Sequence, residues 1–176
     1  MFEVNVLGVV RMCKAFIPMI RQSNGRIVNV SSIVGVVPVK CVGIYSATKF
    51  SIEAISDALR VELAEWNISI SVILAGLIRS EIMRRTDEAI SSKNFNDDQY
   101  NLYKNMFQET ISFRKQRAAY SVSPQVATDA MIHALTNEQP ETRHFVASLG
   151  HLRPSWLIAR IKQLLPDRLF DHLSEQ

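Results

Sequence analysis

Tyr45 and Lys49 are four residues apart in the segment VGIYSATKFSIEAISDALRVEL (42–63), which has the periodicity of a long amphipathic helix. Residues with this spacing share one helix face, so the Lys49 ammonium is expected to lie near the Tyr45 phenol. A neighbouring cation favours the phenolate and is expected to lower the tyrosine pKa from its reference value of about 10. The pair therefore predicts acid–base chemistry near neutral pH, although the same spacing also occurs on ordinary helix surfaces.

Two polar residues earlier in the chain favour a site over an ordinary helix surface. Ser32 ends a predicted strand, 13 residues before Tyr45. At the carboxyl end of a parallel strand, its hydroxyl would face a ligand crevice and could hydrogen-bond a substrate carbonyl. Asn5 lies 27 residues before Ser32, in a segment that is otherwise apolar and helical. Asparagine is a poor helix former, so we expect Asn5 to have a role in the site and not in helix stability.

These four residues, in their order and spacing, resemble the catalytic tetrad of the short-chain dehydrogenase/reductases. The segments NVLG, GRIVNVSSIVG and YSATKFSIEAISDALRVEL are similar to segments of that family and occur in the same order. The resemblance covers about the first 80 residues. YSATKF and an amphipathic C-terminal tail resemble most the branch that acts on steroids, retinoids and other lipid-like alcohols.

The resemblance implies a role for each member of the tetrad. Tyr45 would be the general acid or base for an alcohol and its ketone or aldehyde during hydride transfer. Lys49 would lower the pKa of Tyr45 and bind the ribose of the nicotinamide. Ser32 would orient the substrate oxygen, and Asn5 would hold a water that links Lys49 to solvent.

The segment AGLIRS (75–80) resembles the family's Pro-Gly-x-Val/Ile-x-Thr element, with Ala75 in place of proline. The resemblance implies that Gly76, Ile78 and Ser80 lie against the nicotinamide end of an NAD or NADP cofactor, together with the tyrosine and lysine of the tetrad.

The glycine-rich turn that binds the pyrophosphate in a dinucleotide site has no counterpart in this sequence. The six glycines are isolated from one another. We therefore expect the chain to represent the C-terminal catalytic half of the family's fold, as a fragment or a truncated form, with an incomplete cofactor site. The family's sheet order places the missing strands beside segment 26–32, so this strand is expected to have an open edge that favours association.

The hydrophobic periodicity predicts an alternation of helices and strands joined by short links. Helices are predicted at 2–22, 45–65, 123–137 and 154–173, with one or two more between 79 and 122. Strands are predicted at 26–32, 67–76 and 143–150. Pro18 predicts a kink or an early end of the first helix near residue 17. The region 79–122, with a link near 91–98, is interpreted either as a substrate lid or as a peripheral helical pair.

This order predicts the α/β class, as a partial Rossmann-like, doubly wound parallel sheet of about three strands with flanking helices. We expect one domain over 1–176, with a catalytic segment at 1–80 and a substrate-binding, C-terminal region at 81–176.

Composition excludes several other classes of protein. A net charge of +3 without a basic stripe argues against nucleic-acid binding. Two cysteines without a CxxC pair, and histidines without metal spacing, predict no metal site. The amino-terminal residues lack the pattern of a signal peptide, so a cytoplasmic location is expected. Peripheral attachment of the tail at 154–173 to a membrane is the alternative that its amphipathic pattern leaves open.

Three functions remain as hypotheses. The first is an oxidoreductase acting on a small-molecule alcohol or carbonyl compound. The second is a catalytically incompetent chain that pairs with full-length subunits, since helices 2–22 and 45–65 would form the homo-oligomer interface in the family. The third, an epimerase or dehydratase of the extended branch, ranks last because the chain has no room for a sugar-nucleotide domain.

Overall fold

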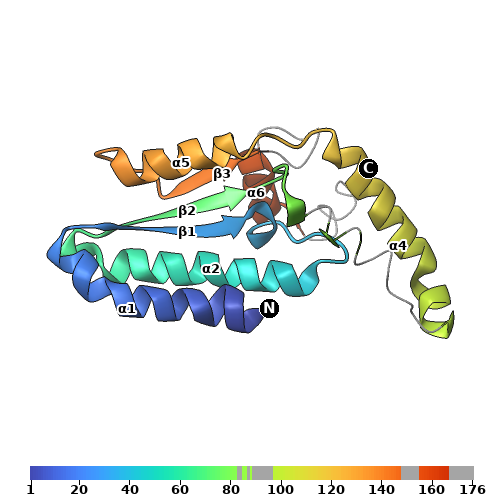
Figure 1. Cartoon of the computed structure of the whole chain (residues 1–176), viewed down its shortest axis with the longest axis horizontal. Coiled ribbons are helices and arrows are strands. Elements are labelled where there is room, and N and C mark those ends of the chain that lie inside the picture. The colour runs from blue at the N-terminus through green and yellow to red at the C-terminus, as the bar shows by residue number, and fades with distance from the viewer. Residues whose placement is uncertain (83–84, 87, 89–96, 148–154, 167–176) are drawn as a thin grey trace.

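The computed structural model describes residues 1–82, 85–86, 88, 97–147 and 155–166. Three strands form one parallel sheet in the order β1–β2–β3, with bounds Arg26–Ser32, Ser69–Ala75 and Arg143–Val146. Helices α1 and α2 lie on one face of the sheet and α5 lies on the other (Figure 1). The predicted α/β class, a Rossmann-like parallel sheet of about three strands, is confirmed.

The helices follow the predicted segments closely. Their bounds are Gly8–Gln22 for α1, Gly43–Glu62 for α2, Asp97–Ala118 for α4, Gln125–Thr136 for α5 and Ser155–Leu164 for α6. A π-helical turn, Glu3–Leu7, precedes α1, and short 3₁₀ turns occupy Ile33–Gly35 and Ala64–Trp66. The early end expected at Pro18 is wrong, because α1 continues to Gln22. Apolar residues of α1 on both sides of the proline pack against one core cluster, which holds the helix together across the lost hydrogen bond.

Three predictions fall at least partly outside the described residues. They are most of the link at 91–98, and parts of the strand predicted at 143–150 and of the tail helix predicted at 154–173. Within the described residues both predicted ends are wrong: β3 ends at Val146, before Ala147 with its positive φ, and α6 ends at Leu164, just ahead of Pro166.

Strand β2 is the centre of the core. Its residues Ile70, Val72, Ile73 and Leu74 are each at most 4% exposed, because helices cover both faces of the sheet and strands flank both edges. The nearly unbroken apolar run in this strand predicted such two-sided burial, which is typical of parallel sheets.

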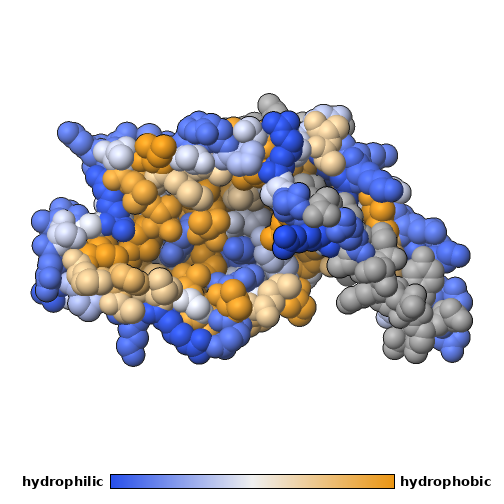
Figure 2. Space-filling view, in the orientation of Figure 1, coloured by the Kyte–Doolittle hydropathy of each residue, from blue (hydrophilic) through white to orange (hydrophobic). Residues whose placement is uncertain are grey.

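Strand β1 pairs with β2 on one side, and its other edge meets no strand within the described part of the chain. Apolar side chains gather along this edge and over the neighbouring face of α1 (Figure 2). Val30 of β1 is 48% exposed, and Phe16 of α1 is 43% exposed. The open edge expected for segment 26–32 is therefore present.

Arg143, the first residue of β3, joins the sheet to α2. Its guanidinium donates to Glu53 over 3.0 Å and to Asp57 over 2.7 Å. Burial would lower the pKa of Arg143, but the two carboxylates raise it overall. Glu53 is only 7% exposed; its Oε2 accepts from Arg143, and its buried Oε1 has no hydrogen-bond partner in the described structure. Arg143 therefore supplies the positive charge and the hydrogen bond that compensate for burial of the Glu53 carboxylate.

We expect Arg143→Met to lower the free energy of unfolding by about 2 to 3 kcal/mol, because it leaves the buried Glu53 carboxylate without a cation. Urea unfolding followed by circular dichroism measures this change. The matched control is Lys40→Met, which breaks an exposed ion pair with Glu109 and should cost less than about 0.5 kcal/mol. Equal losses in the two variants would contradict the role given to Arg143.

Candidate active site

Ser32 lies at the carboxyl end of β1, where the chain turns into the 3₁₀ turn Ile33–Gly35. Its hydroxyl donates to the carbonyl oxygen of Ala75 at the end of β2 over 2.9 Å. It also accepts from the backbone N–H of Val34 over 3.4 Å. These contacts fix the hydroxyl at the edge of the sheet where the strands end, as the sequence predicted.

Tyr45 and Lys49 lie in the first turns of α2, and the Lys49 ammonium is 5.8 Å from the centroid of the Tyr45 ring. Burial raises the pKa of Tyr45, and a hydrogen bond with the Ser32 side chain opposes that rise only in part. Burial also lowers the pKa of Lys49. The expected lowering of the tyrosine pKa is therefore wrong for this structure.

The reason is the position of the Lys49 ammonium. Its Nζ donates to the backbone carbonyl of Val30 in β1 over 2.9 Å. An ammonium held at this carbonyl does not act as the close partner of the phenol oxygen. The desolvation of Tyr45 then dominates its pKa.

Asn5 lies within the π-helical turn Glu3–Leu7, ahead of α1. Its side-chain amide donates to the hydroxyl of Thr48 over 3.2 Å, and that hydroxyl donates to the backbone carbonyl of Tyr45 over 2.7 Å. Asn5 therefore contacts α2 at the residue just before Lys49. The structure brings all four predicted residues to one end of the sheet, from three separate elements.

Gly35 is a positioning residue that the sequence analysis treated only as part of a loop. A Cβ at this position would lie 2.8 Å from the Ser31 hydroxyl oxygen and 2.9 and 3.0 Å from the backbone carbon and Cβ of Lys49. The turn after β1 therefore packs directly on the backbone of α2, which only glycine permits. A glycine three residues after a strand-ending serine was the available signal.

Small polar side chains also hold α2 close to β1. The buried Asn29 amide donates to the Ser56 hydroxyl over 2.8 Å, and the Ser31 hydroxyl donates to the Lys49 carbonyl over 3.4 Å. Each side chain satisfies a polar group at the buried contact between the strand and the helix. Together they fix the distance between Ser32 and the first turns of α2.

Gly76, Ile78 and Ser80 follow the end of β2. The N–H of Gly76 donates to Val146 in β3 over 2.7 Å, and Gly76 follows Ala75, the residue that Ser32 contacts. Ser80 is exposed. The structure therefore places Gly76 beside the tetrad and leaves Ser80 at the surface.

Ile78 presents its backbone groups in a defined direction. Val122 donates to the carbonyl of Leu77 and accepts from the N–H of Arg79, each over 2.9 Å. Ile78 lies between these two residues in a parallel bridge with Val122, so its own N–H and C=O point to the opposite side. Neither group has a backbone partner in the part of the chain that the structure describes.

No helix among the described residues is long and apolar enough to cross a lipid bilayer.

Comparison with protein families finds a match to the family described as short chain dehydrogenase, over residues 1–91. Human 17-beta-hydroxysteroid dehydrogenase type 6 is 32% identical over 154 residues, which are 82% of this chain and 47% of that protein. Rat retinol dehydrogenase 16 is 32% identical over 153 residues, which are 81% of this chain and 46% of that protein. The chain spans about half the length of the curated relatives it matches.

Among solved structures, a short chain dehydrogenase from Burkholderia cenocepacia in complex with NADP superimposes with a TM-score of 0.65 at 22% sequence identity. The match covers 98% of this chain and 56% of that chain. At this identity the likeness concerns the fold, and it agrees with the parallel sheet and flanking helices described above.

Proposed function

This chain belongs to the short chain dehydrogenase family, and we propose that it carries the catalytic half of an NAD(P)-dependent oxidoreductase. The reaction would interconvert an alcohol and a ketone or aldehyde. The observation that carries the proposal is the meeting of Ser32 and Tyr45 at the carboxyl end of β1, with Lys49 one turn further along α2. Because relatives are named for hydroxysteroids and retinol, we propose a steroid, retinoid or similar lipid-like alcohol as the substrate class.

Tyr45 would act as the general acid in the direction of reduction. Burial raises the pKa of its phenol, so the phenol stays protonated at neutral pH and can donate its proton to the substrate carbonyl oxygen. In the direction of oxidation, the phenolate would accept the proton of the alcohol. The Ser32 hydroxyl would turn from the Ala75 carbonyl to the substrate oxygen and orient it.

Lys49 would tune the phenol in the active arrangement. Once its ammonium turns from Val30 towards Tyr45, its charge would stabilise the phenolate and lower the pKa of the phenol. Asn5 would act through α2, because its amide holds the Thr48 hydroxyl that contacts the Tyr45 carbonyl.

The residues after β2 fit the carboxamide of a nicotinamide. A carboxamide carries one carbonyl acceptor and an N–H₂ donor, which complement the outward-facing N–H and C=O of Ile78. Gly76 and Ser80 would flank this contact, and Lys49 would hydrogen-bond the ribose. When bound, the nicotinamide would supply or accept the hydride.

The pyrophosphate and the adenosine of a dinucleotide would make fewer contacts with these 176 residues than the nicotinamide would. Pyrophosphate binding requires a glycine-rich turn at a helix N-terminus, and no two of the six glycines lie close together in the sequence. The cofactor site that this chain offers is therefore the nicotinamide end. We propose that the remaining contacts belong to the part of the fold that the longer relatives possess.

We further propose that residues 1–80 form the catalytic segment and residues 81–176 the substrate-binding region of one domain. Homo-oligomers would form through α1 and α2. These helices leave an apolar groove of about 270 Å³ between them, lined in part by Val10, Ile17, Ile55 and Leu59. The same helices support the alternative function, a catalytically incompetent chain that pairs with full-length subunits.

Titration of the purified chain with NADH and NADPH, followed by nicotinamide fluorescence, separates the two functions. We expect saturable binding, and we expect Lys49→Met to weaken it about tenfold because a charged hydrogen bond to the ribose is lost. Lys40→Met is the matched control and should leave the affinity unchanged. Absence of binding at millimolar cofactor would reject the enzyme function for this chain and support the interaction partner instead.

A further inference from the structure

Thr48 is fully buried on α2, one residue before Lys49, and 0% of it is exposed. Its hydroxyl donates to the backbone carbonyl of Tyr45 over 2.7 Å and accepts from the Asn5 amide over 3.2 Å. A hydroxyl has one proton, and a carbonyl oxygen can only accept. The proton of Thr48 is therefore committed to Tyr45, and Asn5 must present its N–H₂ group to the Thr48 oxygen.

The carbonyl of Tyr45 also connects this hydroxyl to Lys49. In an α-helix each carbonyl accepts from the N–H four residues later, so within α2 the Tyr45 carbonyl is the acceptor for the N–H of Lys49. A threonine hydroxyl that bonds to a carbonyl of the preceding turn often bends the helix at that point. The direction in which α2 presents Tyr45 and Lys49 therefore depends on the Thr48 hydroxyl.

The backbone of Lys49 is also held by the strand and by the turn that follows it. The Ser31 hydroxyl donates to the Lys49 carbonyl over 3.4 Å, and Gly35 leaves no space for even a methyl group beside the Lys49 backbone. With its N–H, its carbonyl and its backbone carbon all in contact, Lys49 can change direction only through its side chain. Thr48 contributes the part of this anchoring that also includes Tyr45.

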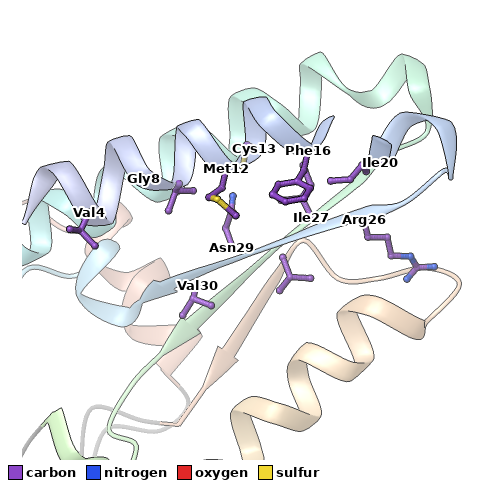
Figure 3. Close-up of a pocket in the computed structure, with 12 residues that line it drawn as sticks. Val4, Gly8, Met12, Cys13, Phe16, Ile20, Arg26, Ile27, Asn29 and Val30 are labelled. Atoms are coloured by element: carbon purple, nitrogen blue, oxygen red, sulfur yellow. The ribbon is translucent and has the colours of Figure 1, made fainter. Parts of the chain in front are cut away.

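The π-helical turn Glu3–Leu7 supports the Thr48 hydroxyl from outside α2. Val4 and Gly8 lie along a groove of about 600 Å³ between α1 and β1 (Figure 3), whereas the Asn5 amide is directed at α2. Because Thr48 is buried, its oxygen depends on a protein donor for a second hydrogen bond, and Asn5 supplies that donor. The route from Asn5 to Tyr45 and Lys49 therefore passes through Thr48.

We propose that Thr48 is a positioning residue whose hydroxyl fixes the turn that carries Tyr45 and Lys49, and that Asn5 acts on this pair through Thr48. The kinetic consequence rests on the proposed oxidoreductase function, whereas the effect on Tyr45 itself can be measured without turnover. The role given to Asn5 differs from the one that the family resemblance implies, in which Asn5 holds a water for Lys49.

Thr48→Val tests the positioning role, because it keeps the branched shape of the side chain and removes the hydroxyl. Carbon-13 NMR of labelled tyrosine measures the pKa of Tyr45 in the whole chain, and the signal is identified by its loss in Tyr45→Phe. Burial is the largest cause of the raised pKa of Tyr45. A loosened turn that admits water should therefore lower this pKa towards its ordinary value. An unchanged pKa in Thr48→Val would overturn the proposal.

Two further variants separate the hydroxyl from a general effect on folding. Thr48→Ser keeps a hydroxyl and should restore the wild-type pKa of Tyr45. Thr136→Val is the matched control, because the Thr136 hydroxyl donates to the Ile132 carbonyl within α5 over 2.8 Å, and it should leave this pKa unchanged. Asn5→Ala changes no residue of α2 and should shift the pKa in the same direction as Thr48→Val, but less. No shift in Asn5→Ala would overturn the route from Asn5.

Turnover distinguishes action through Thr48 from an independent role of Asn5. Thr48→Val should lower kcat about tenfold and leave KM unchanged, because it misdirects Tyr45 without removing a contact with the substrate. Thr48→Ser should recover most of this loss. Asn5→Ala should cause no further loss in the Thr48→Val background, because its route is already broken. Losses that multiply in the double variant would overturn the route through Thr48.

The two measurements also distinguish failure of this inference from failure of the proposed function. A pKa of Tyr45 that responds to Thr48→Val in a chain without turnover would support the positioning role and reject the enzyme function for this chain. Wild-type values of both kcat and the Tyr45 pKa in Thr48→Val would overturn the positioning role and leave the proposed function intact. A loss of kcat that Thr48→Ser does not reverse would also overturn the role of the hydroxyl.

Discussion

Tyr45→Phe is expected to lower kcat about a thousandfold in both directions of the proposed reaction. The substitution keeps the ring and its packing on α2 but removes the hydroxyl that would transfer the proton, a contribution of this size for a general acid or base. Turnover is followed through the absorbance of reduced nicotinamide, with a secondary alcohol or its ketone as the substrate.

Ser51→Ala is the matched control for that experiment. It also removes one hydroxyl from α2, and that hydroxyl donates to the backbone carbonyl of Ala47 within the same helix over 2.9 Å. Its kcat should equal that of the wild type. Activity retained by Tyr45→Phe would remove Tyr45 from the acid–base role.

The raised pKa of Tyr45 also predicts how the turnover rate in each direction changes with pH. Reduction uses the protonated phenol, so its rate should stay level across neutral pH and fall only in alkaline solution. Oxidation uses the phenolate, so its rate should increase as the pH rises towards the raised pKa. Release of Lys49 towards the phenol would lower that pKa and shift both profiles to lower pH.

Gly35→Ala is expected to lower the free energy of unfolding by about 1 to 3 kcal/mol, as overpacking of a tight contact does. The new methyl group would lie 2.9 Å from the backbone carbon of Lys49 and 2.8 Å from the Ser31 hydroxyl oxygen, and neither helix nor strand can yield without moving the other. Because this contact positions the first turns of α2, we also expect a loss of activity. Urea unfolding and turnover measure the two effects.

Gly43→Ala is the control with the same chemical change. A Cβ at Gly43 meets no atom within 4 Å, and the residue begins α2, where alanine is a better helix former than glycine. We expect unchanged or slightly increased stability. Similar losses at both glycines would show that helix propensity or backbone entropy, rather than the contact with Lys49, explains the result.

Most of the fold could be predicted because it depends on local patterns. The apolar run of β2 predicted a strand buried on both faces, and the periodicity of 45–65 predicted α2 within about three residues at either end. The order of helices and strands, read with the right-handed crossover rule, then leaves few topologies other than the one observed. The open edge of β1 followed from the resemblance to a longer family fold.

The site was predictable in its residues but not in its interactions. The spacing of Tyr45 and Lys49 placed them on one helix face, yet it could not show that the ammonium would find the Val30 carbonyl instead of the phenol. That preference depends on a backbone acceptor left free at a sheet edge. It arises from tertiary structure, and it reverses the expected direction of the pKa of Tyr45.

The π-helical turn Glu3–Leu7 separates the orientation of the Asn5 side chain from the orientation of α1. Each residue of an α-helix advances the rotation about the axis by about 100°, and a π turn accommodates one residue more than an α turn. The direction of the Asn5 side chain towards Thr48 and the face that α1 packs on β1 are therefore set by different residues. Deletion of one residue within the turn would restore a regular helix, and α1 would keep its packing while Asn5 rotated away from α2. Insertion or deletion of one residue in this turn would therefore change the direction of Asn5 at the site and leave the packing of α1 against the core unchanged.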